Sequence, residues 1–237
     1  MFGYYGYGYY WDTTYFLVLI GLVLCIGASL LVNSTMKKYG QIRNMRGITG
    51  ADAARRILAS EGIRDVQVEC FGGNSGDHYD PRTKTVCLSD SNYNSASITS
   101  VGVAAHECGH AIQHANGYVP LKLRSSLVPV AKLGSTIGIP LIILGMILSY
   151  NYMLIQIGIW AFVLSILFQL VTLPVEFNAS RRAVGKIEQY GLLSAEENTG
   201  CKKVLSAAAL TYVATAASSI LQLLRLVLLS NRGRRRN

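Results

Sequence analysis

The residues most suited to chemistry lie in one short segment, AAHECGHAIQH, which contains His106, Glu107 and His110. On a helix, residues four apart lie one turn apart on the same face, so both imidazoles can bind one tetrahedral metal ion. Glu107 then projects beside them, toward a water molecule on that ion. Zinc lowers the pKa of such a water to roughly 7, and the carboxylate can accept its proton. The segment therefore predicts a Zn²⁺ site that hydrolyses peptide bonds, with Glu107 as the catalytic base.

The alternative for this segment is a solvated helix face that carries two unrelated histidines. Residues 98–105, which come just before the histidines, are mostly apolar. An apolar segment directly before the histidines favours a buried helix over a solvated one. We therefore expect a helix over about residues 97–115 that holds the metal.

A catalytic zinc site needs a third protein ligand. The metzincin pattern would place glycine at position 113 and histidine at position 116, but these residues are Gln113 and Asn116, which excludes that family. His114 lies two helical turns, about 12 Å, from His106, and this distance is too long for one ion to bind both. His114 is better suited to the helix end or to supporting a ligand.

The acidic residues that follow His110 are few: Glu176, Glu188, Glu196 and Glu197. Ser194 and Glu197 have the spacing of a capping box, which gives Glu197 a structural role. Glu176 comes directly after a long apolar run. We predict that Glu176 is the third metal ligand, and the alternative is a carboxylate that only marks a membrane edge.

Three long apolar runs, at residues 15–32, 133–150 and 153–173, must position these ligands. Each run is long enough to span a bilayer. As one helix, the second and third runs would extend about 60 Å, twice the thickness of a bilayer core. We therefore expect a transmembrane hairpin over residues 133–173 that turns near Asn151. Its two crossings return Glu176 to the side of the histidines.

The charge pattern indicates topology rather than a nucleic-acid partner. The net charge is +9, but the lysines and arginines cluster beside the apolar runs, as in multi-pass membrane proteins. The bias places the Gly/Tyr-rich residues 1–14 outside the cell membrane and the catalytic region in the cytosol. The five cysteines are odd in number and lack a CxxC pair, which fits a reducing, cytosol-facing region.

The region between the first span and the hairpin, residues 37–132, should be a small catalytic unit. Residues 49–62 have the pattern of an amphipathic helix, with Thr49 and Asp52 spaced as a cap. Residues 66–70 and 83–88 look like short strands separated by a Gly/Asn/Asp/Pro-rich loop. The strand at 83–88 could be an edge strand that pairs with an extended peptide, and an ordinary strand is the alternative.

The C-terminal region, residues 174–237, contains the third ligand, an Ala-rich helix and a basic tail. Residues 205–229 are long enough to span, but they carry many polar side chains, and a crossing would export the tail. We therefore expect an interfacial helix here, with a fourth span as the alternative. The predicted fold is mainly α, with three transmembrane helices and a small α+β, zincin-like catalytic domain that contains a short β-sheet.

The stretches DHYDPRTKTVCLS, AAHECGHAIQH, PVEFNASRRA and VLSAAALTYVA, with an apolar hairpin between the second and third, occur in this order over nearly the whole chain. In this order they resemble the YugP-type neutral zinc metallopeptidases, a bacterial membrane family. They are more distantly similar to the heat-shock and CAAX-prenyl membrane proteases of the gluzincin group. The resemblance implies a cytosol-facing, gluzincin-type zinc endopeptidase with His106, His110 and Glu176 on the metal.

The chain departs from this family at two positions near Glu176. The family usually has aspartate where this chain has Asn178, and the wider group has aspartate where Ser180 stands. An aspartate can orient a zinc-bound imidazole as a charged acceptor, whereas Asn178 can do so only through its neutral carbonyl.

Three functions compete for this sequence. The first is an endopeptidase embedded in the lipid bilayer that acts on peptides or membrane proteins. The second is a catalytically silent membrane adaptor with a structural zinc, but structural zinc usually has four protein ligands and three converge here. The third, a transporter, would need polar groups within the first three spans, which have almost none.

In the enzyme, Tyr212 could donate a hydrogen bond to the oxyanion of the tetrahedral intermediate, although tyrosines on such helices more often serve packing.

Overall fold

The computed structural model describes residues 13–72 and 76–234. Residues 1–12, to which we assigned the outer side of the membrane, and the last three residues of the basic tail lie outside the described part of the chain.

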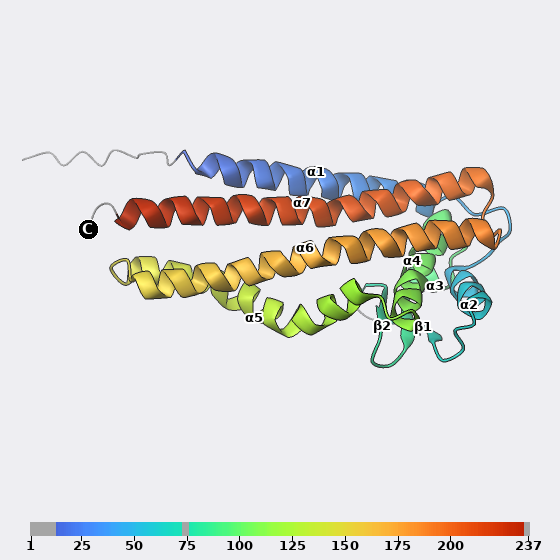
Figure 1. Ribbon diagram of the computed structural model, residues 1–237. Helices are drawn as coiled ribbons and strands as arrows, with labels where there is room; N and C mark the ends of the chain where they lie inside the picture. The colour runs from blue at the N-terminus through green and yellow to red at the C-terminus, as the bar shows by residue number, and fades with distance from the viewer. Residues whose placement is uncertain (1–12, 73–75, 235–237) are drawn as a thin grey trace, which may run out of the picture.

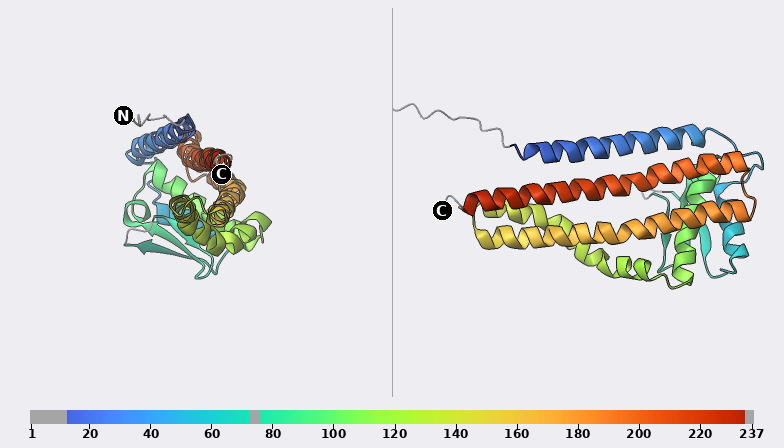
Figure 2. Two further views of the ribbon diagram at one scale, coloured as in Figure 1. Left: turned by 90° about the vertical axis from the view of Figure 1, so that its left-hand side faces the viewer. Right: turned by 45° about the horizontal axis from the view of Figure 1, so that its top comes forward.

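Four long helices run side by side along the molecule, and the sheet and the shorter helices gather at one end of them (Figures 1 and 2). By length and composition, all four long helices are able to cross a membrane. They are α1 (Tyr15–Gly40), α5 (Val119–Ile147), α6 (Tyr152–Gln189) and α7 (Ala195–Arg234).

Helix α7 corrects our expectation of three spans and an interfacial segment at residues 205–229. It runs unbroken beside α1 for almost the whole length of that helix, so it reaches the same depth (Figure 1). The two helices approach closely at Gly21, where an added Cβ would lie 2.6 Å from Ser218 Oγ. Two of its polar side chains bond within the helix, which lowers their cost in an apolar environment: Thr211 donates to Ala208 O at 2.6 Å and Thr215 to Thr211 O at 2.8 Å. The described chain therefore has four candidate spans.

Helices α5 and α6 form a close antiparallel pair joined by a turn that ends at Asn151. The Asn151 side chain caps α6 by accepting from Leu154 N at 3.3 Å. Glycines allow the two backbones to approach, since a Cβ at Gly158 would lie 2.7 Å from Gly138 O. Both helices extend well beyond residues 133–173, and the extension of α6 carries Glu176 to the end of the bundle where the sheet and the shorter helices gather.

The end of the bundle at which the shorter elements gather contains a three-stranded mixed sheet with the strand order β1-β3-β2. Its strands are β1 (Gln67–Phe71), β2 (His78–Asp80) and β3 (Thr85–Ser89). Strand β3 pairs with β1 in parallel and with β2 in antiparallel orientation. Because β3 is the central strand, our interpretation of residues 83–88 as an edge strand is wrong. The free edge near the histidines belongs to β2, which lies in the segment that we expected to be a loop.

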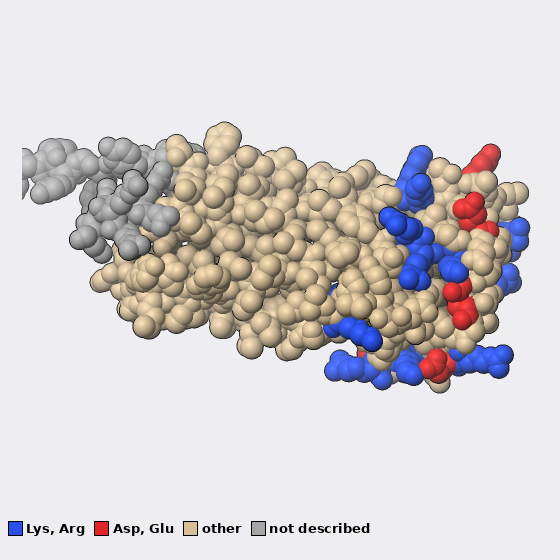
Figure 3. Space-filling model, in the orientation of Figure 1, with Lys and Arg blue, Asp and Glu red and all other residues tan. Residues whose placement is uncertain are grey.

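Three helices complete this end: α2 (Gly50–Ser60), α3 (Asp90–Tyr93) and α4 (Ile98–Ala115). Thr49 and Asp52 form the capping box predicted for α2, and the Ser97 side chain caps α4 by accepting from Ser100 N. Helix α4 lies in the core, with fully buried Val101 and Cys108. On the face shown in Figure 3, the charged side chains gather at this end, and the described residues of the opposite, helical end show none on that face. This separation of polar and apolar surface is typical of a helical bundle in a bilayer with a polar unit at the membrane surface.

Helices α4 and α6 touch where a glycine permits it. A Cβ at Gly109 would lie 2.6 Å from Ala179 O, so only glycine allows this spacing without a backbone shift. Gly109 lies between His106 and His110, and Ala179 lies three residues after Glu176. The close contact therefore brings the histidine face of α4 against the carboxylate of α6.

Candidate metal centre

His106, His110 and Glu176 converge at the contact between α4 and α6. Their potential ligand atoms all lie within 4.8 Å of one another. Glu176 Oε2 lies 3.2 Å from His106 Nε2 and 3.7 Å from His110 Nε2, and the imidazole centroids are 4.8 Å apart. Two ligand atoms that each lie about 2.1 Å from a tetrahedral zinc ion are about 3.4 Å apart. The spacing and the nitrogen and oxygen donor types therefore fit one zinc ion.

Gln113 determines which nitrogen of His110 faces the site. The Gln113 amide nitrogen donates to Val175 O and to Asn178 Oδ1, both at 2.9 Å, which turns its oxygen toward His110. That oxygen lies 3.0 Å from His110 Nδ1, so Nδ1 must carry the proton and donate it. Nε2 of His110 is then left with its lone pair directed at Glu176 and free to bind a metal.

His106 and Glu176 have supporting partners of their own. Ser180 Oγ lies 3.1 Å from His106 Nδ1 and can accept its proton, which leaves Nε2 of that ring for the metal. Arg124 Nη1 lies 3.4 Å from Glu176 Oε1, the carboxylate oxygen that does not face the histidines. Asn178 contributes indirectly, since its oxygen accepts from Gln113 and from Arg182 Nε, at 2.8 Å for the latter. A neutral asparagine and a serine thus occupy the two positions at which the resemblance led us to expect aspartates.

Glu107 lies beside this cluster without being part of it. Its side chain is buried on α4, and burial raises the pKa of its carboxyl group above the usual range of a glutamate. It lines two cavities together with His106 and Glu176. A carboxyl group next to a metal site and open to solvent-sized cavities is placed to exchange a proton with water there.

Two cavities meet at the cluster from opposite sides. The larger, about 800 Å³, is a cleft bordered by β2, α4 and α5. The smaller, about 180 Å³, lies among α1, α4, α6 and α7. Tyr212 and Asp77 line both, but the Asp77 carboxylate already accepts from Ser89 N and Asn92 Nδ2, each at 2.7 Å.

The other acidic residues and histidines that we weighed lie outside the cluster. Glu197 has the structural role predicted for it, because it completes a capping box with Ser194. Glu188 is exposed near the end of α6. His114 contacts Tyr79 through a 2.8 Å bond from Nδ1 to the hydroxyl, which ties the end of α4 to β2. His78 lines the larger cavity from β2.

Sequence reasoning missed Gln113 and Arg124. Gln113 served only to exclude the metzincin pattern, although its position three residues after His110 puts it on the same helix face. Arg124 was interpreted only as a membrane-flanking charge, and no local pattern links it to a glutamate 52 positions later.

We expect Gln113→Leu to weaken zinc binding about 10- to 100-fold, because His110 loses the acceptor that fixes its ring and tautomer. A competition titration against a chromophoric chelator measures this affinity. Asn178→Asp is the matched control, since a carboxylate can still accept from Gln113 and Arg182, and it should retain the parent affinity. Unchanged zinc affinity in Gln113→Leu would show that the amide is not needed to orient the ligand.

Comparisons with known proteins indicate the family of this chain. A family model described as "Putative neutral zinc metallopeptidase" matches residues 14–231. A curated relative from Bacillus subtilis (strain 168), described as "Putative membrane protease YugP", is 45% identical over 222 residues, which cover 94% of this chain and 98% of the relative. No solved structure matches the chain.

Proposed function

The chain belongs to the neutral zinc metallopeptidase family, and we propose that it is a membrane-integrated endopeptidase of the gluzincin type. His106, His110 and Glu176 would hold the zinc, and Glu107 would be the general base. The observation that carries the proposal is the convergence of these three ligands beside a buried glutamate at the meeting point of two cavities.

Different residues of the protein have separate roles in the proposed hydrolysis. Bound zinc supplies Lewis-acid polarisation of water and of the scissile carbonyl group. The Glu107 carboxylate takes the proton of the attacking water and passes it to the departing amine nitrogen, which becomes a good leaving group only when protonated. The Tyr212 hydroxyl lines both cavities beside Glu176 and can donate a hydrogen bond to the carbonyl oxygen as negative charge develops there.

The larger cleft suits an extended peptide. Strand β2 borders it and pairs with β3 on only one side, so the backbone groups of its other edge remain for a substrate strand. The opposite wall includes the apolar residues Leu121 and Val128 of α5, a helix that continues into a candidate span. Membrane proteins with a segment near the bilayer surface, and peptides in that region, are therefore the proposed substrates.

The competing function, a catalytically silent adaptor with a structural zinc, has less support. The only cluster of this kind within residues 13–72 and 76–234 has three ligands, whereas structural sites are usually closed by four. A site with three protein ligands keeps one position for water or substrate, as catalysis requires.

Removal of the metal should abolish peptidase activity. With purified protein and a quenched fluorescent peptide, saturating 1,10-phenanthroline should reduce turnover to background, because zinc provides the polarising charge at the reacting carbonyl. Stoichiometric zinc should then restore turnover. The non-chelating isomer 1,7-phenanthroline should have no effect on turnover. Undiminished turnover by protein shown to be free of metal would refute the proposed function.

We propose that the catalytic end faces the cytosol, because the visible charged side chains gather there, and that four crossings put both chain ends outside (Figure 3). In single-cysteine variants, an impermeant maleimide applied to intact cells should label Asn151→Cys and Ser230→Cys. Native Cys70, exposed on β1, should react only after permeabilisation. Labelling of Asn151→Cys without Ser230→Cys would mean that α7 does not cross. Labelling of Cys70 in intact cells would mean the inverted orientation.

A further inference from the structure

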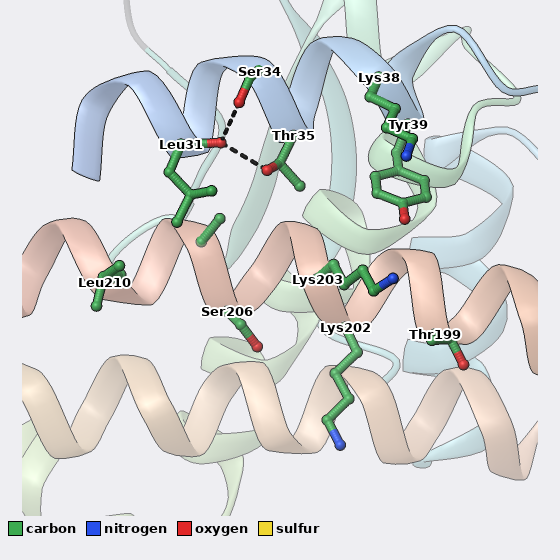
Figure 4. Close-up of a pocket in the computed structure, with 11 residues that line it drawn as sticks. Leu31, Ser34, Thr35, Lys38, Tyr39, Thr199, Lys202, Lys203, Ser206 and Leu210 are labelled. Carbon is green, nitrogen blue, oxygen red and sulfur yellow. Dashed lines mark hydrogen bonds between the residues drawn. The ribbon is translucent and has the colours of Figure 1, made fainter. Parts of the chain in front are cut away.

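A groove of about 750 Å³ lies between α1 and α7, away from the metal centre (Figure 4). It is lined on α7 by residues such as Lys203, Ser206 and Leu210, whereas the turns that border the smaller metal-site cavity include Leu205 and Tyr212. At 3.6 residues per turn these two sets lie on roughly opposite sides of α7. The groove is therefore a separate site on the outer face of the bundle.

The groove changes from apolar to cationic along its length. Leu31 of α1 and Leu210 of α7 lie at one end, and Lys38, Lys202 and Lys203 lie toward the other (Figure 4). The apolar run of α1 stops just after Leu31, so the groove begins at the depth of the lipid hydrocarbon and ends at the depth of the headgroups.

The lysines of the groove have no acidic partner among the described residues. The ion pairs found in residues 13–72 and 76–234 involve other cations, and no carboxylate lines the groove. Lys38 Nζ lies only against the Tyr39 ring, 5.5 Å from its centroid, and Lys202 also borders a neighbouring cavity with Arg181. Several ammonium groups at one end of a cavity, without a counter-charge, attract a phosphate.

The walls of the groove are held together on both sides of it. Toward the cationic end, α7 touches α1 at Gly200, where a Cβ would lie 2.6 Å from Tyr39 Cε1. Toward the apolar end, the Cys25 thiol points to Ala214 O at 3.7 Å. The helices thus meet above and below the groove and leave a gap between the contacts. The gap is therefore formed by the way α1 and α7 pack against each other.

We propose that this groove binds one anionic phospholipid, with its phosphate at Lys38 and Lys203 and an acyl chain along Leu31 and Leu210. The apolar end distinguishes this ligand from a free phosphate ion, which would gain nothing from Leu31 and Leu210. The cationic end distinguishes it from an uncharged lipid, because each lysine near an anionic headgroup is expected to raise the affinity about fivefold.

Native mass spectrometry of delipidated protein in uncharged detergent, titrated with phosphatidylglycerol or phosphatidylcholine, tests the proposal. One phosphatidylglycerol should bind well before further adducts appear, and phosphatidylcholine should bind more weakly. Lys38→Gln/Lys203→Gln should lower the affinity for phosphatidylglycerol roughly 25-fold. Lys38→Gln alone should lower it about fivefold, and Lys37→Gln is its matched control, since it removes the same charge from the adjacent position of α1 without lining the groove.

A second variant tests the shape of the groove rather than its charge. Ser206→Phe keeps all three lysines but fills the groove, and it should lower phosphatidylglycerol binding while leaving the circular dichroism spectrum unchanged. Equal losses in Lys37→Gln and in Lys38→Gln would mean general surface attraction and would overturn the site. Binding of inorganic phosphate as tight as that of the lipid would also overturn it, because the apolar end would then contribute nothing.

Discussion

Glu107→Gln is expected to lower peptidase turnover about 10²- to 10⁴-fold while the protein keeps about one zinc per chain. Glutamine has nearly the size of glutamate and fits the same buried position on α4, so the fold and the ligands should persist. Its amide cannot accept the proton of the attacking water or return it to the leaving nitrogen. The variant therefore removes one chemical role and leaves the metal in place.

The experiment needs matched measurements of turnover and of metal on the same preparations. Glu69→Gln, at an exposed position of β1, makes the same change of charge away from the cavities and should behave like the parent. Substantial turnover by Glu107→Gln, with zinc bound, would assign the proton transfer to another group. Comparison of the membrane proteomes of cells with the parent and the Glu107→Gln protein would then reveal substrates that accumulate only in the variant.

The parts of the fold with local signals could be predicted from the sequence. Helix α4 begins one residue after its predicted start, because Ser97 bonds to the backbone of its own first turn. The capping boxes at Thr49 and Ser194 likewise depend on residues three positions apart. Such signals need no knowledge of the rest of the chain.

The parts that depend on distant contacts could not be predicted. Strand β2 has three residues in a polar loop, and it exists because β3 offers it a pairing edge. For α7, a candidate span, we preferred an interfacial helix because a hydropathy scale counts each hydroxyl group as unfavourable in a bilayer, whereas Thr211 and Thr215 bond to carbonyl groups of their own helix.

The residues of the candidate metal centre also include some with a local sequence signal and some that depend on distant contacts. His106, Glu107 and His110 follow from helical spacing alone, and Glu176 followed from the few acidic residues left once the hairpin had returned the chain to the histidine side. The link from His110 through Gln113 to Asn178 spans two helices and is visible only when α4 and α6 are packed together. It also gives the neutral Asn178 a use that the sequence did not suggest, as the acceptor that holds Gln113 in place.

Glu176→Ala should cause a larger loss of zinc affinity than the roughly 10- to 100-fold loss expected for a supporting residue, because it removes one of the three proposed protein ligands. His106→Ala and His110→Ala should have the same effect. Metal analysis after dialysis should find about one zinc in the parent and little in each variant. Circular dichroism establishes that the helices remain, which is expected because α4 and α6 also pack through Gly109 and Ala179.

Glu188→Ala is the control for this loss, since Glu188 lies on α6 but is exposed and outside the cluster. It should keep full zinc. Glu176→Gln adds a finer test: the amide retains the size of the carboxyl group but loses the charge that faces both imidazoles and Arg124. If Glu176 binds the metal, the Gln variant should lose zinc nearly as completely as the Ala variant. Full zinc in Glu176→Ala, together with loss in Glu188→Ala, would exclude Glu176 as the ligand and with it the three-residue site on which the proposed mechanism depends.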